Sequence, residues 1–324
     1  MDFTDLIDLA AERLGGAALL ANDEFFAPKE NLVRAAAPVW REGEYTERGK
    51  WMDGWETRRR RTPGYDWCIL RLGCPGVIRG TVVDTSFFTG NFPESCSIDA
   101  CAVEGVPDPA RLAGDAGWTE ILPRTALQGN ARNTFQVRSE ERFTHVRLNI
   151  FPDGGVARLR VHGMVAPDWA RLVRPGVELD LAALENGGFA IATSDMFYGN
   201  RQNLLLPGPS LLMSDGWETR RRRGPGNEWV VVRLGARGIV RRVIVDTSHF
   251  KGNAPGECSL DAADSAEADT PSSWAELVVR TPLQPHAVHE FLAEVRDIGP
   301  ITHVRLSIFP DGGVARLRVH GVIA

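Results

Sequence analysis

The chain has 324 residues, a length that predicts two domains because single hydrophobic cores rarely grow beyond about 250 residues. Hydrophobic residues make up 43% and charged residues 24% of the chain, which excludes wholesale disorder and fibrous repeats. The net charge of −5 argues against a nucleic-acid partner. Nearly all basic residues are arginines, which suits a small anionic ligand, although a GC-rich genome gives the same bias.

The N-terminal segment predicts neither export nor membrane insertion. Asp2, Asp5 and Asp8 stand where a signal peptide carries positive charge, and no apolar run approaches the roughly 18 residues that span a bilayer. We therefore expect a cytoplasmic protein without a membrane partner. The cysteines form no CxxC pair and are expected to be reduced thiols. They are Cys68, Cys74, Cys96, Cys101 and Cys258.

Two copies of one sequence pattern follow each other along the chain. Because the copies appear in the same order, we predict domains at residues 1–166 and 167–324, the second opening with a connector, 166–179, that contains Pro167 and Pro175. The matching blocks are DLAAERLGGAALLAND (8–23) with DLAALENGGFAIATSD (180–195), DGWETRRRR (53–61) with its identical copy (215–223), VDTSFFTGN (83–91) with VDTSHFKGN (245–253), and THVRLNIFPDGGVARLRVHG (144–163) with residues 302–321.

Short β-branched runs within each repeat predict strands. Residues 229–235, 239–246 and 275–281 are rich in Val and Ile and are bounded by Gly, Pro, Asp or Asn, whereas helical periodicity is weak. We therefore predict an all-β fold of two tandem jelly-roll sandwich domains related by internal duplication.

The block 144–163 predicts a β-hairpin with PDGG at its turn. In that register the apolar residues Val146, Leu148, Ile150, Ala157, Leu159 and Val161 face the core. The opposite face then sets Arg147 against Arg160 and His145 against His162. Opposed like charges are destabilising, so this face needs an anionic counterpart from a neighbouring strand or loop, a partner domain, or a bound carboxylate.

The duplicated blocks, together with the openings NDEFFAPKENL (22–32) and SDMFYGNRQNL (194–204), resemble the allantoicase family over nearly the whole chain. The resemblance implies two galactose-binding-like jelly-roll modules that hydrolyse allantoate to ureidoglycolate and urea in allantoin and purine breakdown. The chain is thus expected to be a hydrolase of a linear amidine or ureido C–N bond, and to form a homo-oligomer. The alternatives are a non-catalytic tandem ligand-binding module and a structural repeat protein whose charged motifs form interdomain salt bridges.

Allantoate carries a carboxylate and two ureido groups on one carbon, so its site needs a cation, hydrogen-bonding groups and a group that transfers a proton to the departing urea. We assign the acid, base or ureido-binding roles to Asp53, Glu56, Asp215, Glu218 and His249. Substrate binding is assigned to Arg58, Arg59, Arg220, Arg221, Trp55, Trp217, Asn91 and Asn253.

Each assignment has a structural alternative. The four arginines of residues 58–61 would alternate on a solvated edge strand, the tryptophans would pack in the core, and Asp84 and Asp246 would form Asx turns. Phe87 aligns with His249, which puts two equivalent sites per chain in doubt. No cofactor is evident and the seven histidines are scattered, so a divalent-metal requirement stays open.

Overall fold

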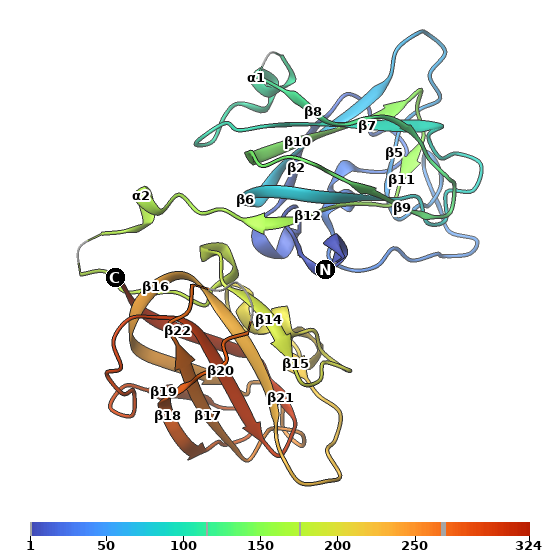
Figure 1. Ribbon diagram of the computed structural model, residues 1–324. Helices are drawn as coiled ribbons and strands as arrows, with labels where there is room; N and C mark the ends of the chain where they lie inside the picture. Colours follow the sequence, from blue (N-terminus) through green and yellow to red (C-terminus); the bar gives the residue numbers. More distant parts are fainter. Residues whose placement is uncertain (1, 115, 175, 267–269) are drawn as a thin grey trace. The chain divides into compact units, whose positions relative to one another are not determined.

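The computed structural model describes residues 2–114, 116–174, 176–266 and 270–324 (Figure 1). The chain forms two compact units, residues 1–166 and 167–324, which we call module one and module two. The α-helix α2 (Trp169–Leu172) lies in the predicted connector, whereas Pro175 falls outside the described residues. No described helix is long and apolar enough to cross a membrane.

Module one is a β-sandwich in which one long strand belongs to both sheets (Figure 1). The first half of β6 pairs with β2 and β10, and its second half pairs with β12 and β9. One sheet therefore has the order β2–β6–β10–β7–β8 and the other β1–β12–β6–β9. The strands are β1 (Ile7–Asp8), β2 (Ala17–Ala21), β6 (Asp66–Asp84), β7 (Ser95–Cys101), β8 (Thr119–Ala126), β9 (Arg132–Gln136), β10 (Arg142–Phe151) and β12 (Arg158–Val165).

Module two repeats this topology, so the prediction of a duplicated all-β fold is confirmed. Its sheets have the orders β14–β16–β20–β17–β18 and β13–β22–β16–β19. The predicted strands 229–235 and 239–246 are wrong as separate elements, because the backbone continues through Gly235 and Gly238 as one strand. The strands are β13 (Leu179–Asp180), β14 (Phe189–Thr193), β16 (Glu228–Asp246), β17 (Glu257–Ala263), β18 (Ala275–Pro282), β19 (Val288–Phe291), β20 (Ile301–Phe309) and β22 (Arg316–Ile323).

The predicted hairpin 144–163 is wrong. Strand β10 pairs with β6 and β7, whereas β12 pairs with β6 and β1, so Arg147 does not oppose Arg160 and His145 does not oppose His162. Between them the chain passes from one sheet to the other through β11 (Gly155–Val156), which pairs with β5 (Trp55–Glu56). Gly154 has a φ of 135° and lies where a Cβ atom would meet backbone atoms at 2.7 Å.

The predicted core face of this block is confirmed. Leu148, Leu159 and Val161 are fully buried, together with their neighbours on the same face. The predicted anionic counterparts are also present, from other strands and loops. Arg147 Nη2 lies 2.8 Å from Asp99 Oδ2 on the neighbouring strand β7, so each arginine is matched by a carboxylate rather than by another arginine.

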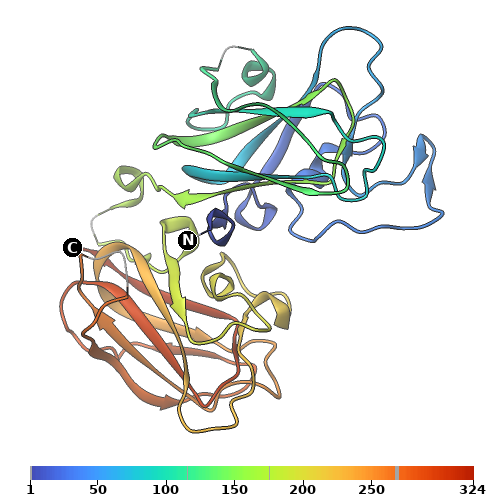
Figure 2. The same cartoon turned by 45° about the vertical axis from the view of Figure 1, so that its right-hand side comes forward.

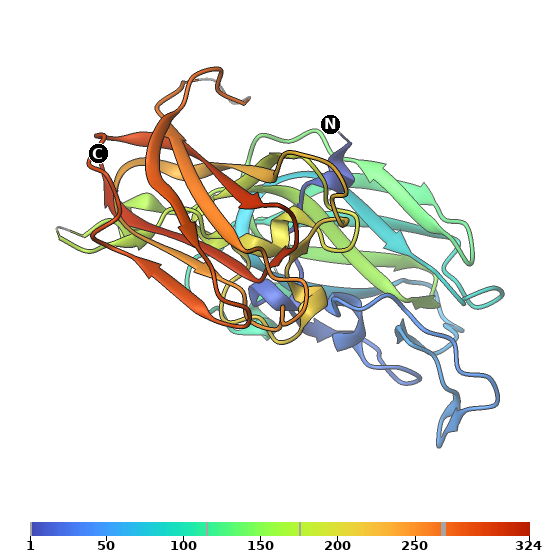
Figure 3. The same ribbon diagram turned by 90° about the horizontal axis from the view of Figure 1, so that it is seen from below.

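The remaining elements are short. Residues 34–52, the largest insertion of module one relative to module two, carry a small β-hairpin that projects from its sandwich (Figures 2 and 3). The short elements of the two modules are η1 (Phe3–Asp5), η2 (Glu12–Leu14), η3 (Lys29–Val33), β3 (Tyr45–Thr46), β4 (Gly49–Lys50), α1 (Pro109–Ala113), η4 (Leu184–Asn186), η5 (Arg201–Leu205), η6 (Met213–Asp215), β15 (Trp217–Glu218) and β21 (Gly313–Val314).

Candidate active site

The duplicated blocks 53–61 and 83–91 meet at one end of module one, and their copies meet in the same way in module two. Strand β5 pairs with β11, and the Gly155 N–H donates to the Asn91 carbonyl at 2.7 Å. Thr57 is buried, and its Oγ1 accepts a hydrogen bond from the Gly154 N–H at 3.1 Å. Much of the DGWETRRRR block therefore fastens this end of the sandwich to the PDGG segment.

Two pairs of predicted site residues are brought together. Asn91 Nδ2 donates to Glu56 Oε1 at 2.7 Å, and Asn253 Nδ2 donates to Glu218 Oε1 at 2.6 Å. The burial of Glu56 raises the pKa of its carboxyl group, an effect that outweighs the hydrogen bond from Asn91. A carboxyl group with a raised pKa suits proton donation to a leaving group near neutral pH.

The predicted edge strand for the arginine runs is wrong, because β5 and β15 end at Glu56 and Glu218 and the arginines follow in irregular backbone. Arg58 Nη2 lies 2.6 Å from Asp23 Oδ2 while 63% of its side chain stays exposed. In module two, Arg220 Nε lies 3.9 Å from Asp195 Oδ1, and the Arg220 side chain is likewise largely exposed. The next arginine of each run, Arg59 or Arg221, is exposed and has no ion-pair partner in the described ranges.

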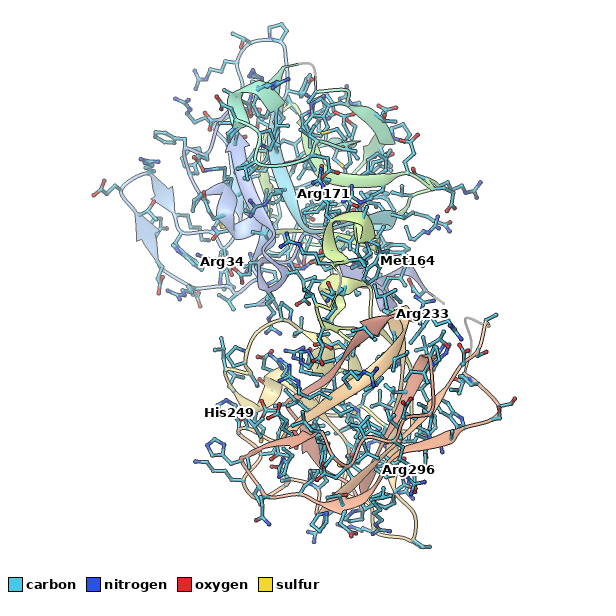
Figure 4. All side chains as sticks on the ribbon, turned by 90° about the vertical axis from the view of Figure 1, so that its left-hand side faces the viewer. Arg34, Met164, Arg171, Arg233, His249 and Arg296 are labelled. Atoms are coloured by element: carbon cyan, nitrogen blue, oxygen red, sulfur yellow. The ribbon has the colours of Figure 1, made fainter. Side chains whose placement is uncertain are left out.

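Asp53 and Asp215 are held in buried ion pairs. Arg158 Nη2 lies 2.9 Å from Asp53 Oδ2, and Arg316 Nη2 lies 2.9 Å from Asp215 Oδ2. Arg34, labelled in Figure 4, approaches Asp53 Oδ1 at 3.5 Å. Burial opposes the ionisation of Asp53, but the hydrogen bond and charge of Arg158 hold the pKa of its carboxyl group below the ordinary value. These contacts favour a structural role over acid–base catalysis.

The two tryptophans and His249 are also fixed by the surrounding protein. Trp55 and Trp217 are fully buried, and each indole Nε1 donates to a backbone carbonyl at 2.8 Å, so the packing interpretation replaces substrate stacking. His249 (Figure 4) follows β16 with a φ of 71°, and its Nε2 lies 2.9 Å from the Ser210 carbonyl. The aligned Phe87 adopts a φ of 70°, so both residues share the left-handed region of backbone conformation.

Sequence reasoning missed a pocket of about 400 Å³ in module two that several charged side chains line. Its polar lining comes from β13, η4, β16 and β22, and the arginines and the histidine belong to the alternating VARLRVH run. The acidic residues lie in the duplicated blocks 180–195 and 245–253, but nothing in the sequence showed that these blocks meet the run in space. The charged and titratable lining residues are Asp180, Glu185, Asp246, Arg316, Arg318 and His320.

The described part of the chain holds no cluster of side chains arranged as metal ligands. Within the ranges that the structure describes, no group of three or more His, Cys, Asp or Glu side chains is arranged to hold a metal ion. Asp180, Glu185, Asp246 and His320 share the pocket of module two but do not form such a group.

Each of the two modules matches a known repeat. Residues 7–166 and residues 179–324 match the family model described as the allantoicase repeat. The chain belongs to the allantoicase family. A similar family member is the probable allantoicase 1 of Burkholderia mallei, which is 49% identical over 98% of this chain and 94% of its own length. A probable allantoicase of Pseudomonas syringae is also 49% identical, over 99% of this chain and 98% of its own length.

Solved allantoicase structures share this architecture. The crystal structure of the allantoicase of Saccharomyces cerevisiae is 38% identical, with a TM-score of 0.81 over 97% of this chain and 92% of the yeast chain. A second allantoicase structure has a TM-score of 0.83 and 37% identity, and covers 98% of this chain. The allantoicase fold therefore extends through both modules.

Proposed function

We propose that this protein is an allantoate hydrolase that converts allantoate and water to ureidoglycolate and urea. The observation that carries the proposal is the similarity to probable allantoicases along nearly the whole chain, through both modules. This similarity favours an enzyme over the non-catalytic tandem binding module and over a purely structural repeat.

The Glu56–Asn91 pair, with its copy Glu218–Asn253, supports a role in proton transfer. In the reaction the bond between the central carbon and one ureido nitrogen breaks, the nitrogen gains a proton, and a water oxygen bonds to the carbon while releasing a proton. We assign the proton donation to Glu56, because burial raises the pKa of its carboxyl group and Asn91 fixes its Oε1 at 2.7 Å. Glu218 occupies the same position in module two.

The arginines beside these pairs are proposed to bind the substrate carboxylate. Arg58 and Arg220 are oriented by Asp23 and Asp195, and both guanidinium groups stay largely exposed. Arg59 and Arg221 follow them in the chain and are exposed as well. Guanidinium groups bind carboxylates through two parallel hydrogen bonds, so an oriented arginine can place the carboxylate relative to the acid.

The reaction is tested by incubating the purified chain with allantoate and measuring urea together with the glyoxylate formed when ureidoglycolate decays. Assays with a chelator and with added divalent metals address the metal requirement. We expect urea release above the spontaneous rate, and its absence under every metal condition would refute the proposal. Glu56→Gln and Glu218→Gln, measured singly, identify the module that supplies the acid, since the essential variant loses roughly 10²–10⁴-fold in kcat.

A cytoplasmic location and assembly into a homo-oligomer are part of the same proposal. Cys68, Cys96, Cys101 and Cys258 are buried free thiols, which suits a reducing compartment because disulfides are rare in the cytosol. Cell fractionation tests the location, and sedimentation of the purified chain tests the assembly.

A further inference from the structure

The pocket of module two is built on the outer face of the sheet formed by β16 and β22. Leu317 and Val319 are fully buried in the core, so the alternating side chains of Arg316 and Arg318 point to the opposite face. In the register of the two strands, Asp246 lies opposite Arg316. The pocket volume of about 400 Å³ falls within the range of roughly 300–1,000 Å³ that is usual for small-molecule sites.

The two arginines of the pocket are already matched by carboxylates. Arg316 Nη2 lies 2.9 Å from Asp215 Oδ2, and its Nη1 donates to the Asp215 carbonyl at 2.6 Å. Arg318 Nε lies 3.6 Å from Asp180 Oδ2. The pocket therefore does not present two uncompensated positive charges, and a purely anionic ligand would not be drawn to it by the arginines.

Three charged side chains of the pocket can meet a ligand, beside His320. Glu185 and Asp246 feel the charge of Arg318 but form no ion pair with an arginine or lysine in the part of the chain that the structure describes, and Asp246 accepts a hydrogen bond at Oδ1 from the Ser248 N–H at 2.7 Å. Arg318 Nη2 donates to the Gly208 carbonyl at 2.9 Å, while its buried Nη1 has no hydrogen-bond partner. Two carboxylates and one arginine with an unpartnered N–H group thus belong to the lining of the same cavity.

This combination selects the charge and chemistry of the ligand. An anion would be repelled by Glu185 and Asp246, and a cation would leave the buried Arg318 Nη1 without an acceptor. A neutral group that carries several N–H donors and one carbonyl oxygen satisfies all three positions. A ureido group, R–NH–CO–NH₂, has this pattern, since its N–H groups can bind carboxylates while its oxygen accepts from a guanidinium.

We propose that the pocket of module two is a binding site for a ureido group, with Glu185 and Asp246 accepting its N–H donors and Arg318 donating to its oxygen. The proposal deepens the proposed function, because both the substrate and the product of that reaction carry such groups. It also assigns the site to one module. Module one has the matching Asp84 and Arg160, but Arg13 occupies the position of Glu185 in the aligned segment DLAAER.

The test measures binding to the full chain by calorimetry, with methylurea as the neutral ureido probe. N-methylacetamide is the matched control ligand, because a methyl group replaces the terminal NH₂ of the probe. Glu185→Gln keeps the shape of the side chain, Glu185→Arg copies module one, and Arg13→Gln is the matched control in module one. The melting temperature of each variant verifies that it is folded, and Glu185 lies at the exposed rim, where substitution disturbs no packed core.

We expect one site in the wild type and in Arg13→Gln that binds methylurea at least about tenfold more tightly than N-methylacetamide. Glu185→Gln should weaken this site at least about tenfold, and Glu185→Arg should remove it. Absence of binding to the wild type, equal binding of the two ligands, or an unchanged site in Glu185→Arg would overturn the inference. Urea release from allantoate tests the proposed function separately, since the binding measurement needs no turnover.

Discussion

Replacing Asp53 by alanine should destabilise module one strongly, because it leaves a buried charge without its partner. Only 1% of the Arg158 side chain is exposed. Its guanidinium donates to the Ala36, Asp53 and Ala157 carbonyls, and its Nη2 lies 2.9 Å from Asp53 Oδ2. The alanine variant keeps the three carbonyl contacts but removes the carboxylate that compensates the charge.

Removing one partner of a buried ion pair costs about 3–5 kcal/mol. For a module of this size each kcal/mol lowers the melting temperature by roughly 2–4 °C, so we expect a decrease of about 6–20 °C in the transition of module one. Asp53→Ala combined with Arg158→Met should be less destabilised than the sum of the two single variants, because the uncompensated charge is then absent.

The assay is differential scanning calorimetry of the full chain, supported by hydrogen exchange to identify which module unfolds first. Asp215→Ala is the matched variant in module two, where Arg316 Nη2 lies 2.9 Å from Asp215 Oδ2. It should destabilise module two in the same way. A melting temperature of Asp53→Ala within about 2 °C of the wild type, together with lost activity, would refute the structural assignment and restore Asp53 as a catalytic candidate.

Three further predictions concern single groups. Glu56→Gln should stabilise module one at neutral pH, because the burial that raises the pKa of Glu56 penalises its ionised form. In unfolding measurements this gain should vanish at pH values low enough to protonate Glu56 in both the folded and the unfolded state. Burial raises the pKa of Cys101 to about 11 and that of Cys258 to about 12. We therefore expect all five buried thiols to react with a maleimide only after denaturation. Labelling of the native chain within minutes would contradict this prediction. Arg58→Ala should change stability by less than about 1 kcal/mol in thermal melting, because 63% of the Arg58 side chain is exposed to solvent. The variant should raise the KM for allantoate roughly tenfold, and an unchanged KM would exclude Arg58 from substrate binding.

The fold class could be predicted from the sequence because the duplication presents the strand signals twice. The pairing of the strands could not be predicted. The PDGG segment predicted a local hairpin, but β10 and β12 both pair with the distant β6. Turn chemistry reports only on neighbours in the chain, and the length of β6 offers two separate pairing sites that no local pattern reveals.

The residues of the candidate site could be predicted from the sequence, but the contacts between them could not. The pairing of Glu56 with Asn91 joins two blocks that were recognised, although nothing in the sequence showed that they touch. The need of the arginine face for carboxylates was predicted from charge alone, but its partners come from segments distant in the chain, such as Asp99 for Arg147 and Asp180 for Arg318. The pocket of module two stayed hidden because the repeated block that contains Glu185 does not reveal that its short 3-10 helix packs beside β16 and β22.

The 19-residue strands β6 and β16 each serve both sheets of their module. A sandwich of two independent sheets can lose one sheet while the other keeps its hydrogen bonds, but here the central strand cannot leave one sheet without pulling on the other. Opening either sheet therefore amounts to opening the module. Amide hydrogens of β10 and β12, which bond to opposite halves of β6, should then exchange with solvent through the same opening event, as members of one cooperative unit.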